Sequence, residues 1–336
     1  MSKKKVFITG IAGFIGGQLA RRLILNGYEV AGCDDFSSGF KDNVPPGVQF
    51  IECDVRDLAH MRSALKDTDV AFHAAALAHD GLSFFSPHEI ASNIFAATTS
   101  LVSAVVANRV RRLVFCSSMA RYGHGQSPFL ESQMPAPTSP YGIAKVASEE
   151  VIKSMADVHG FEWVICVPHN VIGVGQTYDD PFRNVAAAMI NRVLQGRPPI
   201  IFGDGEHRRS FSPVQDILGV LEQLINSPKA IGQIVNVGPD NECISMNQLS
   251  ARILSLTNRD LRPIYLPPRP QEVQEANCSA NKARELFNYR PEISLEESLK
   301  EMIEWVAKRG VRAFDYRRSV EIENSLTPKV WLDANI

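Results

Sequence analysis

A glycine-rich turn near the amino terminus constrains the fold of this chain more than any other feature. Residues 5–9 (Lys-Val-Phe-Ile-Thr) are predicted to form a short buried strand, and three glycines, Gly10, Gly13 and Gly16, follow it. An apolar helical run then extends to Leu25. Glycine lacks a Cβ, so the backbone can approach a pyrophosphate at the positive end of a helix. This strand–turn–helix pattern predicts a parallel α/β unit that binds a dinucleotide.

An acidic pair marks the end of the next predicted strand. Residues 29–33 are apolar enough for a buried strand, and Asp34 and Asp35 follow it. A carboxylate about 20 positions past the glycines accepts hydrogen bonds from the adenosine ribose and repels a 2′-phosphate. The pair therefore favours NAD over NADP. The alternative is a solvated pair of aspartates at a strand end.

Strands continue to alternate with helical segments as far as residue 167. Further strands are predicted at 48–53, 70–72, 111–115 and 161–167. This rhythm is typical of an α/β Rossmann fold, a doubly wound parallel sheet. We predict an NAD-binding domain over 1–167, to which segments of roughly 206–240 return. A smaller C-terminal substrate-binding α/β region then covers 168–314, and 315–336 is a tail without an assigned role.

The middle of the chain carries a candidate proton-transfer group. Ser118 follows a predicted strand, and Ser139 and Pro140 suit the N-cap and first position of a helix. Tyr141 and Lys145 lie four residues apart on one face of that helix. An ammonium beside a phenol favours phenolate, so we expect a lowered pKa for Tyr141. The trio predicts proton transfer at a hydroxyl while hydride leaves the carbon. The alternative is an ordinary helix with a surface tyrosine and lysine.

Together these motifs resemble the extended short-chain dehydrogenase/reductase superfamily, and within it the nucleotide-sugar epimerases and dehydratases, such as UDP-glucose and UDP-N-acetylglucosamine 4-epimerases. The resemblance runs from about Lys5 to about Trp305. The spacing of three residues from Gly10 to Gly13 is the form of the glycine motif found in this superfamily. It implies that Ser118, Tyr141 and Lys145 are catalytic. It implies NAD contacts at Gly10, Gly13, Phe14, Ile15, Gly16, Asp34, Asp35, Ser37, Ser38, Asp54, Val55, Ala74, Ala75, Ala76, Asn93, Tyr141, Lys145 and Pro168.

The second half of the chain resembles the family's UDP-sugar site. Residues 168–173 are similar to the motif Arg-x-x-Asn-Val-Tyr-Gly, although Val167 replaces the arginine and Ile172 the tyrosine. Arg209 and Arg269 match two arginines that hold the diphosphate. The resemblance implies substrate contacts at Ser118, Met119, Tyr141, Asn170, Asn184, Val185, Ile200, Phe202, Arg209, Arg269 and Ala276.

Three polar side chains in these segments have open roles. His169 is either a sugar contact or a hydrogen-bonded structural histidine. His73 is expected to be a packing histidine. Arg121, where relatives have valine, is unexplained and is a candidate for binding an acidic sugar substituent.

The residues after Ser118 narrow the reaction by comparison with the family. Dehydratases carry Asp-Glu where this chain has Met119 and Ala120, and 3,5-epimerases carry a cysteine at the position of Ala120. Decarboxylases usually have glutamate at the position of Ser118. Elimination favours a 4-epimerase that interconverts UDP-GlcNAc and UDP-GalNAc, or UDP-glucose and UDP-galactose. Another reaction of the family (dehydratase, UDP-uronate epimerase or 4-keto reductase) remains an alternative. A non-catalytic NAD-binding regulator is disfavoured by the intact trio. The small Ala276 leaves room for an N-acetyl group.

Composition gives no case for other partners. A net charge of −2 with 21% charged residues favours neither nucleic acid nor a membrane surface. The six cysteines have no zinc-site spacing, which favours reduced thiols in the cytosol and no metal. We expect that no apolar run is as long as a transmembrane helix. We also expect a cytoplasmic protein. The resemblance implies a homodimer through the helices that begin near Asn93 and at Tyr141.

Overall fold

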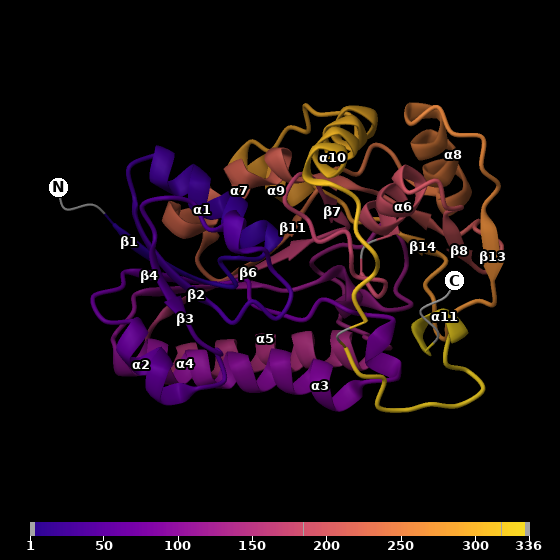
Figure 1. Cartoon of the computed structure of the whole chain (residues 1–336). Coiled ribbons are helices and arrows are strands. Elements are labelled where there is room, and N and C mark those ends of the chain that lie inside the picture. Colours follow the sequence, from indigo (N-terminus) through magenta and orange to yellow (C-terminus); the bar gives the residue numbers. More distant parts are fainter. Residues whose placement is uncertain (1–3, 184, 317, 333–336) are drawn as a thin grey trace.

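The computed structural model describes residues 4–183, 185–316 and 318–332, and a parallel sheet forms its centre. Seven strands lie in the order β11-β6-β5-β4-β1-β2-β3 (Figure 1). Their bounds are β1 (Lys5–Thr9), β2 (Glu29–Asp34), β3 (Gln49–Glu52), β4 (Val70–His73), β5 (Arg112–Cys116), β6 (Glu162–Pro168) and β11 (Gln233–Val237). The strand order reverses between β1 and β4, and ligands of such sheets bind outside the strands' carboxyl ends at that point. The predicted doubly wound Rossmann sheet is confirmed.

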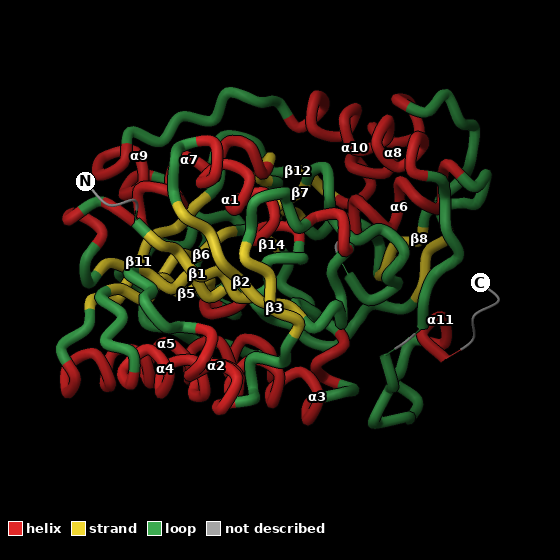
Figure 2. The backbone as a smooth tube through the Cα atoms, turned by 60° about the vertical axis from the view of Figure 1, so that its left-hand side comes forward, coloured by secondary structure: helices red, strands yellow, loops and turns green. Residues whose placement is uncertain are grey.

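Helices cover both faces of this sheet, as Figure 2 shows. One face carries α1 (Phe14–Leu25), α7 (Val214–Asn226) and α9 (Asn281–Phe287). The other carries α2 (Leu58–Ala64), α4 (Ala97–Ala107) and α5 (Pro140–His159). Every residue of β4 and β5 is buried, as expected for strands covered on both sides. The sheet is therefore a rigid platform whose ends can hold side chains in place.

The smaller region packs around a core of its own. Its helices are α6 (Val185–Leu194), α8 (Met246–Leu256) and α10 (Leu295–Arg309), and they share buried residues such as Ile190, Leu249 and Leu299. Capping boxes fix the starts of α8 and α10. Short strands complete the region: β7 (Val171–Ile172), β8 (Ile200–Phe202), β9 (Arg208–Arg209), β10 (Ser212–Pro213), β12 (Ile244–Ser245), β13 (Ile264–Leu266) and β14 (Glu275–Ala276).

One helix is longer than the sequence analysis expected. α3 (Pro87–Ala91), the π-helical turn η3 (Ser92–Ala96) and α4 form a continuous 21-residue helix that is apolar enough to cross a membrane by length and composition. Half of its apolar window is nevertheless buried inside the protein, where the helix packs against α2 and α5. The expectation of no run of such length is therefore wrong. Asn93 lies within this helix and not at its start.

Candidate active site

The glycine turn at the end of β1 has the backbone geometry of a phosphate cradle. Gly10 has a positive φ of 72°, and a Cβ on it would lie 2.7 Å from the backbone of Ala75. A Cβ on Gly16 would lie 2.2 Å from the Gly10 carbonyl oxygen. Only glycine fits either position, and α1 begins at the next residue after Gly13. The cradle that a Cβ would fill, open at a helix N-terminus, fits the pyrophosphate of a dinucleotide.

Asp34 at the end of β2 is held beside this turn. Its Oδ2 accepts a hydrogen bond of 3.0 Å from the Ala12 amide, and its Oδ1 accepts one of 2.9 Å from the Phe36 amide. Burial raises the pKa of Asp34, while these backbone N–H groups oppose the rise. The carboxyl group is thus oriented by the cofactor turn itself.

One continuous cavity of about 510 Å³ joins this cofactor side to the substrate side. Each described residue at which the family resemblance implies an NAD or substrate contact lines it. Asn184, the remaining one, lies outside the described residues. The roles of these residues stay predictions. The fold nevertheless places all of them, from Gly10 to Ala276 in the sequence, around one cavity.

The proposed catalytic trio meets at the carboxyl end of β5. Ser118 is the N-cap of η4 (Met119–Tyr122), and Tyr141 and Lys145 lie in the first turns of α5. Tyr141 and Ser118 line the same cavity, and the Ser118 hydroxyl is near enough to the phenol to lower its pKa. The Lys145 ammonium donates a 2.8 Å hydrogen bond to the Cys116 carbonyl oxygen. Ser139 accepts from the Gly142 amide at 3.0 Å, so the predicted N-cap of this helix is present.

The expected fall in the pKa of Tyr141 is not found, and burial is the reason. The tyrosine is 6% exposed and Lys145 is 3% exposed. Burial raises the pKa of Tyr141, with the nearby Ser118 hydroxyl opposing the rise, and burial lowers the pKa of Lys145. The Lys145 Nζ atom lies 5.9 Å from the centroid of the Tyr141 ring and is engaged by a backbone carbonyl. Desolvation of the phenolate therefore outweighs the attraction of the ammonium.

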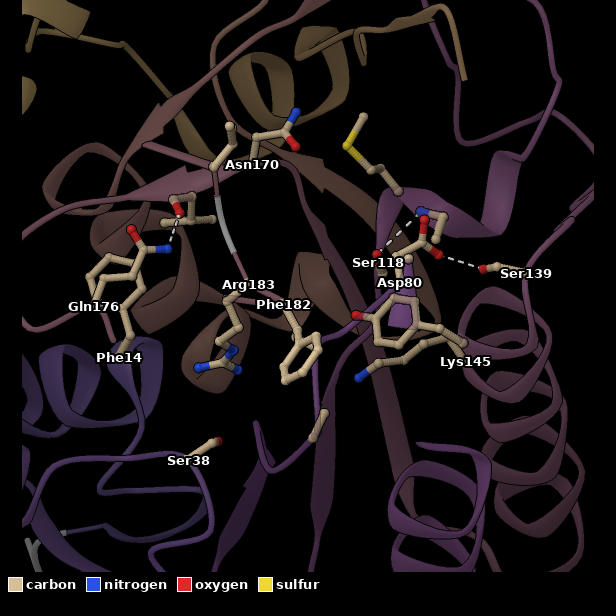
Figure 3. Close-up of a pocket in the computed structure, with 18 of the residues that line it drawn as sticks. Phe14, Ser38, Asp80, Ser118, Ser139, Lys145, Asn170, Gln176, Phe182 and Arg183 are labelled. Atoms are coloured by element: carbon tan, nitrogen blue, oxygen red, sulfur yellow. Dashed lines mark hydrogen bonds between the residues drawn. The ribbon is translucent and has the colours of Figure 1, made fainter. Parts of the chain in front are cut away.

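Asp80 is a cavity residue that the sequence analysis missed. Its Oδ1 accepts a 2.5 Å hydrogen bond from the Ser139 hydroxyl, and Figure 3 shows the carboxyl group between Ser139 and Ser118. Its side chain is open to the cavity, and the protein around that cavity raises the pKa of Asp80 by desolvation. It lies in a loop after β4, with no motif around it that points to a site. Its proximity to Tyr141 arises only from the folding of the loop onto α5.

Arg209 and Arg269 converge on one carboxyl group at the substrate side. Arg269 Nη2 lies 2.5 Å from Glu272 Oε1, and Arg209 Nη2 lies 3.8 Å from the same oxygen. The two guanidinium groups lower the pKa of Glu272, although its burial opposes this. Both guanidinium groups face the cavity, with Glu272 and Asp80 as their acidic neighbours. Such a pair of guanidinium groups suits a diphosphate.

Arg183 adds a further cation to the cavity. It follows Phe182 in the loop before α6, and Figure 3 shows its guanidinium group pointing into the cavity between Phe182 and Ser38. Burial lowers its pKa, and the nearby Asp180 opposes the fall.

The three polar side chains with open roles, His73, Arg121 and His169, are buried and do not line the cavity. Arg121 is 1% exposed, and its Nη2 forms a 3.1 Å ion pair with Glu149 Oε2 on α5, so it does not bind an acidic sugar. His169 is fully buried and bonds the Pro239 carbonyl oxygen at 2.9 Å, which makes it the structural histidine. His73 is buried between Thr9 and Thr98, as expected for packing.

Comparisons with known proteins agree with this arrangement. The model of the NAD dependent epimerase/dehydratase family matches residues 6–238. A putative UDP-glucose 4-epimerase of Methanocaldococcus jannaschii is 32% identical over 306 residues, which cover 90% of this chain and 98% of that protein.

Two solved structures illustrate the range of sugars among similar proteins. A UDP-N-acetylglucosamine 4-epimerase of Methanobrevibacter ruminantium, in complex with UDP-N-acetylmuramic acid, has a TM-score of 0.85 at 29% identity and covers 92% of this chain and 100% of its own. A UDP-glucuronic acid 4-epimerase of Bacillus cereus, in complex with UDP-glucuronic acid and NAD, has a TM-score of 0.85 at 25% identity and covers 91% of this chain and 100% of its own.

Proposed function

The chain belongs to the NAD dependent epimerase/dehydratase family, and on that premise we propose that it is a UDP-sugar 4-epimerase. One observation carries the proposal. Ser118, Tyr141 and Lys145 line the cavity between its cofactor side and its arginine-lined substrate side. A sugar hydroxyl there can lose its proton while its carbon loses hydride.

Tyr141 is the group that we propose to move the proton. When bound, NAD supplies the hydride acceptor and a positively charged nicotinamide ring. The raised pKa of Tyr141 keeps the phenol protonated in the protein alone, so an added positive charge is needed to favour the phenolate. Lys145, fixed to the Cys116 carbonyl oxygen, supplies part of that charge, and Ser118 orients the substrate oxygen.

A 4-epimerase must hold its nucleotide in place while the oxidised sugar rotates to present its other face to the cofactor. Arg209 and Arg269 lie on separate segments, β9 and the loop before β14, and both reach Glu272. We propose that a diphosphate takes its place among these groups and remains anchored. Ala276, at the end of β14, lines the same cavity with the smallest chiral side chain and leaves the sugar room to rotate.

Asp80 on the sugar side favours a neutral sugar, and Arg183 is the cation in the same cavity that works against this preference. Arg121 is held in an ion pair with Glu149. Asp80 places a carboxyl group beside Ser139 and Tyr141. A carboxylate disfavours a uronic acid by like-charge repulsion and accepts hydrogen bonds from hydroxyl or acetamido N–H groups. We therefore propose UDP-GlcNAc and UDP-GalNAc, or the plain hexoses, as substrates.

Asp80 also supports a second candidate reaction. The elimination made from Met119 and Ala120 assumed that no further acid or base is close, and Asp80 supplies one from a distant segment. A carboxyl group with a raised pKa can remove a proton from a carbon beside the 4-keto group, as a dehydration or a 3- or 5-epimerisation requires.

A panel of UDP-sugars in deuterated water separates the two candidates. The 4-epimerase predicts that each substrate equilibrates with its C4 epimer, with no deuterium at C3 or C5 and no net formation of NADH. Deuterium at C3 or C5, or an elimination product, would identify the second reaction. UDP-glucuronic acid should be converted least, and preferential conversion of it would overturn the argument from Asp80.

We also propose a homodimer formed through the helix surface of η3 and α5. Phe95 and Ile143 on these packed helices are 38% and 53% exposed and would be covered in such a dimer. Light scattering of wild type and Ile143→Glu tests this, because a monomeric wild type would contradict it.

A further inference from the structure

The C-terminal segment, described over residues 311–316 and 318–332, is attached to the protein at several points, although its sequence predicts no role. It leaves α10, passes α3 and ends in α11 (Lys329–Leu332) near β8 and β13, as the yellow end of the chain in Figure 1 shows. Its start is fixed to α6. The Asn191 amide donates 2.8 Å to the Arg312 carbonyl oxygen, and its Oδ1 accepts 3.1 Å from the Arg312 amide.

The middle of the segment is bonded to the opposite side of the cavity. The Glu321 carboxylate accepts hydrogen bonds from the backbone amides of His88 at 3.0 Å and Glu89 at 2.8 Å, at the first turn of α3. Arg318 pairs with Glu89 at 2.8 Å and also donates to the carbonyl oxygen of Ser37, in the loop that follows Asp34 and Asp35. The segment thus connects the substrate region with the cofactor side.

The end of the segment places an indole in the wall of the substrate cavity. Trp331 is 4% exposed, and its ring centroid lies 5.4 Å from that of Phe182, 5.7 Å from that of Phe85 and 6.3 Å from that of Phe202. Trp331, Val330 and Tyr316 all line the cavity. The segment therefore provides part of the site and not merely a cover over it.

Trp331 borders the same part of the cavity as Arg269 and Phe202. The Arg269 guanidinium, which we propose to hold the diphosphate, lies 4.9 Å over the ring of Phe202. A Cβ on Gly81 would be 3.3 Å from Arg269 Nη1 and 3.6 Å from the Trp331 ring, so both side chains border the same small space. A base joined to that diphosphate through a ribose reaches these aromatic rings, and bases stack well on aromatic side chains.

Similar proteins are complete without about a tenth of this chain. The matches cover 98–100% of the length of these relatives and 90–92% of this chain.

We propose, resting on the proposed function, that the C-terminal segment is a substrate-binding element in which Trp331 forms the nucleobase wall of the UDP-sugar site. Its anchors on Asn191, on α3 and on the Ser37 loop hold the indole against Phe182 and Phe202. The segment then contributes affinity for the nucleotide that is independent of the chemistry at Tyr141.

The test is calorimetric titration of the full chain with UDP alone, so that it needs no turnover. Trp331→Ala should weaken UDP binding about tenfold, the effect of losing one base–aromatic stack. Trp331→Phe keeps an aromatic ring and should stay within about threefold. Leu332→Ala, the adjacent residue with a 46% exposed side chain, is the matched control and should bind UDP like wild type.

A fluorescence titration reads Trp331 without altering it. In the Trp163→Phe, Trp305→Phe double variant, Trp331 is the remaining tryptophan of the three in the chain. UDP should change its emission, and the same titration in wild type should give an equal Kd.

Unchanged UDP affinity in Trp331→Ala, or no emission change on UDP binding, would overturn the proposal even if the enzyme is an active epimerase. Conversely, UDP binding that depends on Trp331 in a protein without epimerase activity would leave this inference standing and refute the proposed reaction.

Discussion

The cofactor side and the substrate side of the cavity are built in different ways. On the cofactor side, backbone at the ends of β1 and β2 and in the turn after β4 forms the surface, and Gly10 and Asp34 act through main-chain geometry. On the substrate side, single side chains such as Arg209, Arg269 and Trp331 arrive from separate loops and short strands. A backbone site tolerates no added atom, whereas a side-chain site can lose one member and keep the rest.

Loss of the proton-transfer group should have the largest effect. Tyr141→Phe removes the phenol oxygen and keeps the ring, so turnover should fall about 10²–10⁴-fold, as for one acid–base group. NAD content should be unchanged, because the cofactor cradle is made by other residues. Tyr265→Phe, an exposed tyrosine on β13 that bonds Asn247, is the control. Turnover of Tyr141→Phe within a few-fold of wild type would contradict the mechanism.

A single methyl group should break the backbone side of the site. Gly10→Ala places a Cβ 2.7 Å from Ala75 in a positive-φ turn, so the turn must move and NAD should be lost on purification. Gly27→Ala has a similar φ of 85° but nothing within 4 Å of the added atom. It should keep NAD with a small loss of stability. Equal NAD content in the two variants would refute the close fit.

Removal of one arginine should weaken the side-chain side without abolishing it. Arg209→Ala and Arg269→Ala each lose charge-assisted hydrogen bonds worth about 1.5–3 kcal/mol, or about 10–150-fold in UDP affinity. The neighbouring Arg208→Ala is the control, because Arg208 is exposed and bonds a backbone carbonyl oxygen. If either arginine variant bound UDP like wild type, that residue would not hold the diphosphate.

Arg121 tests whether the buried ion pair with Glu149 serves stability and not sugar binding. Arg121→Met leaves Glu149 buried and unpaired, and breaking such a pair costs about 3–5 kcal/mol of unfolding free energy. Denaturant unfolding should show this loss, while the ratio of activities on UDP-glucuronic acid and UDP-GlcNAc stays unchanged. A shift in that ratio without a loss of stability would restore Arg121 as a sugar contact.

The smallest expected effect concerns the choice of sugar. Ala276→Tyr narrows the cavity beside the C2 substituent, so kcat/KM for UDP-GlcNAc should fall about tenfold or more, the discrimination of a sterically blocked pocket. The value for UDP-glucose should change only a few-fold. If the variant kept its N-acetyl activity, residue 276 would not limit the pocket, and Asn277 or the adjoining loop would define it.

The two sides also differ in how far the sequence predicts them. The strand–glycine–helix pattern and the Tyr141–Lys145 spacing are local, so the fold and the proposed cofactor contacts follow from neighbouring residues. Asp80 and Trp331 carry no motif, and long-range packing alone brings them to the cavity. The pKa of Tyr141 was misjudged because spacing shows the nearby charge but not the desolvation that outweighs it.

The central claim is that one hydroxyl-bearing carbon is oxidised and then reduced by the same hydride. The most direct measurement uses UDP-GlcNAc labelled with deuterium at C4, incubated with enzyme and analysed by NMR with unlabelled NADH in the solution. We predict UDP-GalNAc that keeps deuterium at C4, in equilibrium with its precursor. Loss of the label to the added NADH or to solvent, or a product changed at any other carbon, would contradict the account.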